Sequence, residues 1–285
     1  MVRHKNAREI EGLRAAGDLV GRTLAEVARH VAVGVTTLEL DRVAEAFVRA
    51  HGAEPAFKGY RVGRNVFPAT LCTSVNDQVV HGIPDDRPLE DGDLVSCDCG
   101  VVLDGFYGDS AFTFAVGTLS EENRKLCVST YEALLKGVEA ARIGNRIGDI
   151  GHAVQSHCEA DGFGVVRDLV GHGIGRSLHE EPSVPNFGRA GSGRKMKDGL
   201  VICIEPMINL GTDRVITGSD GWTIRAADGT PSAHYEHMVA IRKGGTDVLT
   251  TFKYIEDVLG SAPYQEPKPH TTSTERREPI ANHPV

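Results

Sequence analysis

Two carboxylates lie inside apolar, strand-like runs that flank a turn signal, and this arrangement limits what the chain can fold into. The stretch reads SCDCGVVLDGFYGDSAF and spans residues 96–112, with Asp98 and Asp109 on opposite sides of Asp104-Gly105. Glycine readily adopts the positive φ that a tight turn needs, so Asp104-Gly105 predicts a β-hairpin. The fold must therefore either expose both carboxylates to water or neutralise them inside the protein.

A turn centred on Asp104-Gly105 sets the register of the two strands. Asp98 is then expected opposite Ala111, and Asp109 opposite Gly100. The two carboxylates form a diagonal pair on one face, roughly 7–8 Å apart at the backbone. In a dry site they would repel each other, so one would stay protonated or a cation would be held. The alternative is that both point into solvent from a half-exposed hairpin.

Composition restricts the class of protein. The chain has 285 residues, of which 40% are hydrophobic and 25% charged, as in globular proteins with an ample core. A net charge of −8 argues against a broad basic surface for nucleic acid. No apolar run reaches membrane-spanning length, and the first residues lack a signal-peptide pattern. We therefore expect a cytoplasmic protein with neither a DNA nor a membrane partner.

The cysteines are consistent with a reducing compartment. Six are scattered along the chain, and we expect free, mostly buried thiols. Cys97 and Cys99 flank Asp98, but a single C-x-C without a second cysteine pair is a weak zinc signal. We interpret both as small core residues.

Hydrophobic periodicity indicates the same order of elements twice. The expected order is helix–helix–strands, over residues 8–31, 37–51 and 71–114, and again over 120–138, 147–162 and 165–252. Thr36 and Glu39 fit a capping box, Gly52 can end the second helix, and Ser120 caps the third. The expected organisation is one catalytic domain over residues 1–259, with halves at about 8–118 and 119–255, and a disordered tail over 260–285.

Short echoes between the halves support an internal duplication. LEDGDLVSCDCG at 89–100 resembles MKDGLVICIEPM at 196–207, and VVHGIP at 79–84 faintly resembles LVGHGIG at 169–175. In this alignment Asp98 corresponds to Glu205, another carboxylate in an apolar strand. Coincidence is the alternative, because an Asp-Gly pair followed by a strand is common.

Five polar side chains in apolar surroundings form a candidate metal site: Asp98, Asp109, His172, Glu205 and Glu236. A structural zinc site prefers cysteine and histidine and closes at four ligands, whereas this set suits two divalent ions. Its oxygen-rich character favours Mn²⁺, Fe²⁺ or Co²⁺ as much as Zn²⁺. Two such ions would ready a water for attack on an amide near a free amino end. Taken singly, His172 could belong to a turn, and Glu236 could cap or salt-bridge a strand end.

The motifs, in this order, resemble type I methionine aminopeptidases of the short bacterial subtype. The ordered stretches are DGDLVSCDCGVVLDGFYGDSAF, GHGIGRSLHEEP, IEPM and YEH, and TSVND at 73–77 and HGIP at 81–84 belong to the same pattern, within roughly residues 8–250. The resemblance implies an α/β (α+β) pita-bread fold, in which two related halves with mainly antiparallel sheet surround a dinuclear metal site. It also implies removal of the initiator methionine when the second residue is small, by a hydroxide that bridges the two metal ions.

The resemblance assigns a role to each matching residue. The five metal-site residues become ligands, with Asp109 and Glu236 bridging both ions and Glu205 also carrying a proton. His81 would lie near the substrate amine and the scissile amide. His179 would hydrogen-bond the substrate carbonyl. The methionine pocket would be lined by Phe57, Tyr60, Phe67, Cys72, Leu178 and Trp222.

The resemblance also implies a monovalent ion, a substrate and an oligomeric state, and the sequence departs from the family pattern at two places. A monovalent ion, Na⁺ or K⁺, is expected near Asn76, Gln78 and Ser232. The expected substrate is the N-terminus of a nascent polypeptide at the ribosome, and the expected state is a monomer. Residues 62–66 look like an insertion beside the pocket mouth, and position 178 is leucine where an aromatic is common. The alternatives are a prolidase or X-Pro aminopeptidase of the same fold, and a non-catalytic binding module.

Overall fold

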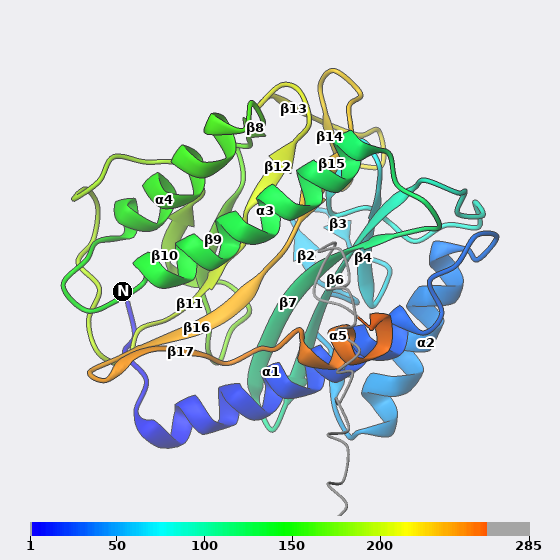
Figure 1. Ribbon diagram of the computed structural model, residues 1–285. Coiled ribbons are helices and arrows are strands. Elements are labelled where there is room, and N and C mark those ends of the chain that lie inside the picture. Colours follow the sequence, from blue (N-terminus) through cyan, green and yellow to red (C-terminus); the bar gives the residue numbers. More distant parts are fainter. Residues whose placement is uncertain (1, 261–285) are drawn as a thin grey trace, which may run out of the picture.

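The computed structural model describes residues 2–260, and it consists of two helix–helix–strand halves (Figure 1). The first half contains α1 (Ala7–Ala28), α2 (Thr37–Ala50), β1 (Glu54–Pro55), β2 (Arg61–Val62), β3 (Asn65–Val66), β4 (Leu71–Val75), β5 (Gln78–Val80), β6 (Leu94–Leu103) and β7 (Phe106–Ala115). The second half contains α3 (Glu121–Ala140), α4 (Ile147–Ala160), β8 (Gly164–Val165), β9 (Val170–Gly173), β10 (Glu180–Pro185), β11 (Val201–Ile204), β12 (Met207–Asn209), β13 (Val215–Thr217), β14 (Ile224–Ala226), β15 (Ser232–His234), β16 (His237–Arg242), β17 (Gly245–Val248) and α5 (Lys253–Leu259).

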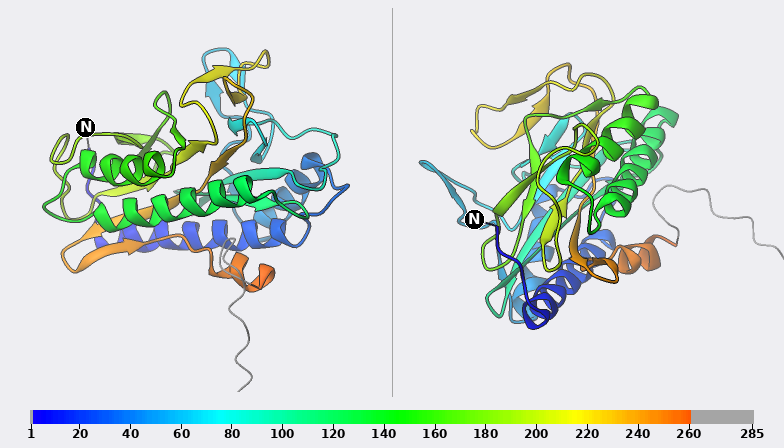
Figure 2. Two further views of the ribbon diagram at one scale, coloured as in Figure 1. Left: turned by 45° about the horizontal axis from the view of Figure 1, so that its top comes forward. Right: turned by 90° about the vertical axis from the view of Figure 1, so that its left-hand side faces the viewer.

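Two antiparallel sheets form the main strand layers. In the first half β6 pairs with β1, β4 and β7, and in the second half the strand order is β10-β9-β11-β16-β17. Figure 2 shows α1, α3 and α5 on one side of these strands. The packing of α1 on β7 is close, because a Cβ added at Gly108 in β7 would lie 2.5 Å from the carbonyl carbon of Ala16. The helices therefore cover one face of the strand layers.

The predicted register of the central hairpin is confirmed. Strands β6 and β7 pair antiparallel with Asp98 opposite Ala111 and Gly100 opposite Asp109. Asp104 and Gly105 form the turn, and both have positive φ, 51° and 75°. Local turn chemistry and alternation were sufficient to set this register, because a shift by one residue would move every core side chain to the other face.

The two halves repeat each other in backbone detail. Helices α2 and α4 both have 14 residues and occupy the same place in their halves. In the first half the Leu89 N–H donates to the Val35 carbonyl over 2.8 Å, and in the second the Met196 N–H donates to the Asn145 carbonyl over 2.9 Å. The glycines of the two aligned Asp-Gly pairs have φ of 93° and 82°. These repeated bonds support the duplication that the sequence echoes indicate.

The predicted helix caps are confirmed, and one boundary is wrong. The side chain of Thr36 accepts from the Glu39 N–H, and that of Ser120 accepts from the Asn123 N–H. Helix α1 ends at Ala28 rather than near residue 31. The chain must turn there, because the N–H of Gly34 donates to the Leu89 carbonyl.

Four short elements and the tail complete the comparison with the sequence. Helix α5, strand β1 and the short pair β2–β3 were not predicted, because seven residues or fewer give no periodic signal. The expected tail lies, apart from Gly260, outside the described residues. All six cysteines are free and buried, as expected. Within residues 2–260, no helix is long and apolar enough to cross a membrane.

Candidate active site

The candidate site forms where strand β7 of the first half meets the chain between β15 and β16 of the second. The Glu236 N–H donates to the Ala111 carbonyl over 2.9 Å, and the Ser110 hydroxyl donates to the Glu236 carbonyl over 2.6 Å. These bonds bring Asp109, on β7, beside Glu236. The register of β6 and β7 adds Asp98 to the same face.

The remaining members come from strands β9 and β11. His172 lies in β9, and Glu205 directly follows β11. The pairing of Ile202 with Gly173 joins these strands, so both side chains can reach the same space. The structure therefore brings together all five residues proposed as metal ligands, three in strands and two just outside strands, from both halves of the chain.

One cavity contains every side chain that the sequence singled out for the site. It has a volume of about 230 Å³. Its walls comprise the five proposed ligands, His81 and His179, and the proposed pocket residues Phe57, Tyr60, Phe67, Cys72, Leu178 and Trp222. Sequence reasoning placed residues 62–66 beside the pocket mouth, and Val62 does line the cavity, but it did not identify the further wall residues Val80, Leu169, Val170 and Met207. These are apolar residues in or beside short strands, where nothing local distinguishes a cavity wall from a core side chain.

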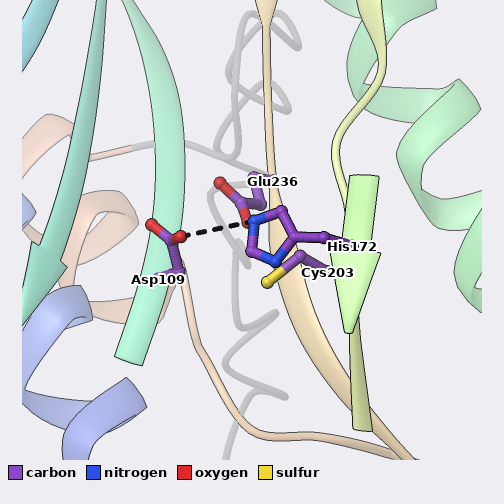
Figure 3. A group of neighbouring side chains, drawn as sticks. All are labelled: Asp109, His172, Cys203 and Glu236. Carbon is purple, nitrogen blue, oxygen red and sulfur yellow. Dashed lines mark ion pairs between the residues drawn. The ribbon is translucent and has the colours of Figure 1, made fainter. Parts of the chain in front are cut away.

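His172 points an unprotonated nitrogen at carboxylates. Its Nδ1 lies 2.9 Å from the Gly173 carbonyl oxygen, so Nδ1–H is the donor and Nε2 carries the lone pair. Nε2 lies 3.7 Å from Asp109 Oδ2, the contact dashed in Figure 3, and 3.6 Å from Glu205 Oε1. Burial lowers the pKa of His172 to about 3, so the ring is neutral at neutral pH. A lone pair that faces two carboxylates repels them unless a cation lies between.

The carboxylates themselves lack partners. Within the described residues, one oxygen of each of the four carboxylates is buried without a hydrogen bond. Burial raises the pKa of Asp98 to about 7 and raises the pKa of Asp109, Glu205 and Glu236 well above the ordinary values. Such groups are costly inside a protein unless protonated or bound to cations. The donor set therefore fits divalent metal ions, which these five residues would hold.

Cys203 is a neighbour of the site that the sequence did not predict. It lies within 4.8 Å of ligand atoms of Asp109, His172 and Glu236, and Figure 3 shows its sulfur beside the imidazole. Burial raises the pKa of its thiol well above the ordinary value, so the thiol is neutral at neutral pH. Its position two residues before Glu205 on an alternating strand was the only signal, and the thiol resembles any small core residue.

The two other histidines of the cavity are neutral as well. Burial lowers the pKa of His81 to about 4 and lowers the pKa of His179. His81 has a φ of 60°, a backbone conformation that a non-glycine residue rarely adopts and that is typical of functional sites. The Nδ1 of His179 lies 2.8 Å from the Tyr60 hydroxyl. This bond leaves Nε2 of His179 available to another group.

The proposed methionine pocket is an apolar end of the same cavity. Phe57, Phe67, Cys72 and Leu178 are all less than 9% exposed. Trp222 closes the pocket against Phe67, with ring centroids 5.3 Å apart in an edge-to-face arrangement. Asp220 holds the Trp222 backbone, because its carboxylate accepts from the Trp222 N–H over 2.8 Å. These side chains give the cavity an apolar end, and the side chain that it binds stays a prediction.

The positions expected near a monovalent ion are close in space. The Asn76 carbonyl accepts from the Ser232 N–H over 2.8 Å, and the Gln78 side chain accepts from the Val75 N–H over 3.0 Å. Asn76 has a φ of 53°. These bonds join strands of both halves at this point, and the monovalent ion itself stays a prediction.

The buried Asp98 carboxyl group is expected to make the stability of metal-free protein depend on pH. The Asp98 pKa is raised in the folded protein from 3.8 to about 7 by burial. A group with a raised pKa contributes stability below its unfolded pKa and loses that contribution as the pH rises through its folded pKa. In chelator, the unfolding temperature of the wild type should therefore fall relative to that of the Asp98→Asn variant between these two pKa values. Calorimetry across this range measures the difference.

The comparison with Asp98→Asn separates the carboxylate from the histidines. Burial lowers the pKa of His81, His172, His234 and His237, which makes the folded protein less stable as the pH falls below their ordinary value of 6.5. That effect is common to both proteins and cancels in the difference. A difference that does not change with pH would contradict the raised Asp98 pKa.

Comparison with known proteins identifies the class. Residues 11–243 match the model of metallopeptidase family M24. The chain belongs to this family and is therefore a metal-dependent peptidase. Within the family, the resemblance to type I methionine aminopeptidases is confirmed by a methionine aminopeptidase from Clostridium perfringens, which is 53% identical over 253 residues, covering 89% of this chain and all of the relative.

Solved structures confirm the pita-bread fold. The crystal structure of methionine aminopeptidase from Rickettsia prowazekii has a TM-score of 0.86 and 41% identity, covering 88% of this chain and all of that chain. A prolidase from Pyrococcus furiosus has a TM-score of 0.70 at 24% identity and is covered to only 65% of its length. The likeness to the prolidase shows a shared fold alone.

Proposed function

We propose that this protein is a methionine aminopeptidase that removes the initiator methionine from peptides and nascent chains with a small second residue. The observation that carries this proposal is a single cavity with a cation-binding end and an apolar end. At one end an imidazole lone pair and four buried carboxylates converge, and at the other Phe57, Phe67 and Trp222 enclose an apolar pocket. Methionine-type relatives at 53% identity support the same assignment.

The residues of the chain divide the work of cleavage. The apolar pocket holds the methionine side chain and excludes water around the first peptide bond. Asp98, Asp109, His172, Glu205 and Glu236 would hold divalent ions, which when bound polarise a carbonyl and supply a nucleophilic water near neutral pH. Glu205 accepts a proton from the attacking water and returns it to the departing amine.

His179 and His81 act on the substrate from positions in the same cavity, with the ring of His179 centred 4.3 Å from that of His172. If the Tyr60 hydroxyl donates to Nδ1 of His179, the neutral ring carries its proton on Nε2 and can donate to the substrate carbonyl oxygen. This bond strengthens as negative charge develops on that oxygen. His81, fixed in an unusual backbone conformation, lies at the amine and the scissile amide.

Removing the Tyr60 hydroxyl tests how His179 is positioned. The Tyr60→Phe variant keeps the aromatic wall of the pocket but removes the hydrogen bond that fixes which ring nitrogen of His179 carries the proton. We expect kcat for a Met-Ala-Ser peptide to fall about two- to tenfold, the value of one hydrogen bond, with little change in KM. Steady-state kinetics measures both. A raised KM with an unchanged kcat would show that the hydroxyl serves binding and not the position of His179.

A peptide-cleavage assay tests the proposed function directly. Purified chelated protein is supplied separately with Mn²⁺, Fe²⁺, Co²⁺ and Zn²⁺ and incubated with Met-Ala-Ser, Met-Leu-Ser and an Ala-Pro peptide. We expect free methionine from Met-Ala-Ser only, and no product in chelator. Cleavage of the Ala-Pro peptide instead would favour the prolidase alternative. Intact peptides with every metal, in a protein that binds none, would favour a binding module.

The cellular setting completes the proposal. We propose a monomer with one catalytic domain over residues 1–259, acting in the cytoplasm on nascent N-termini at the ribosome. A net charge of −8 and the absence of a membrane-spanning helix within residues 2–260 are compatible with this setting. A Na⁺ or K⁺ ion near Asn76, Gln78 and Ser232 is proposed to brace the junction between the halves.

A further inference from the structure

The segment between two walls of the methionine pocket is a β-hairpin. Strands β2 and β3 pair antiparallel, with Arg61 opposite Val66 and Val62 opposite Asn65. The Phe67 N–H donates to the Tyr60 carbonyl over 2.8 Å and continues this register to the base of the hairpin. The hairpin therefore rises directly from the pocket wall, and Figure 2 shows it at the edge of the molecule.

One face of the hairpin continues the pocket wall. Residues directly opposite in an antiparallel pair share a face, and residues two apart along a strand share it too. Tyr60, Phe67, Val62 and Asn65 thus lie on one face, and Arg61 and Val66 on the other. Of the two valines, only Val62 lines the cavity. The wall formed by Tyr60 and Phe67 therefore continues outwards to the next pair on the same face, Val62 and Asn65.

Val62 lies at the open end of the cavity. Its residue surface is 58% exposed although it lines the same space as the buried pocket residues. An aminopeptidase cavity has a closed end for the first side chain and an opening through which the rest of the peptide leaves. A largely exposed wall residue belongs to that opening, through which the peptide after the scissile bond would pass.

The hairpin also contacts the other half of the molecule. The Asn65 amide Nδ2 lies 3.4 Å from the Gly221 carbonyl oxygen, next to Trp222. A Cβ added at Gly221 would lie 2.6 Å from Asn65 Nδ2, so the contact is close. Asp220 accepts from the N–H groups of Trp222 and Thr223 in this turn, so the hairpin contacts a segment that is itself held by hydrogen bonds, although residues 61–66 are all exposed.

We infer that the β2–β3 hairpin is a binding subsite for the residues that follow the first methionine, with Val62 as its apolar contact. This inference rests on the proposed function and adds a substrate preference to it. Peptides of three or more residues with an apolar third side chain bury that side chain against Val62. Dipeptides end before they reach it.

Matched peptides and variants test the subsite in the metal-loaded, full-length protein. The substrates are Met-Ala, Met-Ala-Ser and Met-Ala-Leu, and the variants are Val62→Ala, Val66→Ala and replacement of Arg61–Val66 by Asn-Gly, a two-residue hairpin turn. We expect the wild type to prefer Met-Ala-Leu over Met-Ala-Ser. Val62→Ala should reduce that preference about threefold or more, through the loss of apolar contact.

The control is the other valine of the same hairpin. Val66→Ala removes the same atoms from the opposite face and should retain the wild-type preference, whereas the Asn-Gly replacement should abolish it. An unchanged preference in Val62→Ala, or an equal loss with all three peptides, would overturn the inference. Failure of the wild type to release methionine from Met-Ala would instead contradict the proposed function.

Discussion

Replacing Asp109 by alanine is expected to abolish peptide cleavage and to remove bound metal. Asp109 is 3% exposed, its Oδ2 lies 3.7 Å from His172 Nε2, and Glu236 approaches it from the other half. Without this carboxylate, the other four proposed ligands lose the group that lies close to both His172 and Glu236. Replacing a group that only orients a metal ligand lowers metal affinity or activity about 10- to 100-fold. Replacing a ligand itself should therefore lower activity by more than about 100-fold. Metal content by mass spectrometry and methionine release are the two measurements.

Two companion variants make the Asp109 result specific. Asp109→Asn keeps the shape of the side chain and removes its charge, and it should also lose metal. Asp86→Ala changes an exposed aspartate on the surface and should keep both metal and activity. Full metal occupancy and normal turnover in Asp109→Ala would exclude Asp109 as a ligand, and the two-metal interpretation would fail with it.

Replacing His179 by alanine is expected to lower kcat by about 10²- to 10³-fold, with a much smaller change in KM. Its Nδ1 bonds the Tyr60 hydroxyl, and burial keeps the ring neutral by lowering its pKa. Nε2–H can then donate to an oxygen that gains negative charge during the reaction. Loss of one such preorganised donor has this magnitude in other hydrolases. Full kinetic profiles with Met-Ala-Ser measure kcat and KM separately.

The His179 result has its own controls. His179→Gln retains an N–H donor and should recover part of the lost kcat, whereas alanine should not. His152→Ala changes an exposed histidine on α4 and should behave as the wild type. Metal content should be unchanged in all three variants. If His179→Ala raised KM and left kcat intact, His179 would bind the substrate equally in its ground and transition states.

Much of the fold follows from local sequence. The Asp104-Gly105 turn and the alternation around it determined the β6–β7 register, and capping residues such as Thr36 and Ser120 marked where helices begin. The elements that escaped prediction are short, and their stability comes from tertiary contact. Helix α5 is an example, because the Tyr254 hydroxyl bonds Asp18 on α1 over 2.8 Å. A seven-residue helix has little stability of its own.

The membership of the candidate site was also visible in the sequence. A carboxylate in an apolar strand is expensive wherever the strand lies, so Asp98, Asp109 and Glu205 stood out without any knowledge of the fold. Wall residues such as Val80, Leu169 and Met207 did not, because they are chemically ordinary. Their role depends on which space they face, and that depends on segments far away in the chain.

The sequence by itself determined which groups carry charge, where the chain turns, and that the two halves share one plan. Only the tertiary structure decided that His172 aims a lone pair at Asp109 and Glu205, and that Asn65 of the β2–β3 hairpin contacts Gly221 in the other half. The physical reason is the range of the interactions. Turns, caps and alternation act over a few residues, whereas these contacts need strands of both halves held side by side by backbone hydrogen bonds such as Glu236 N–H to the Ala111 carbonyl.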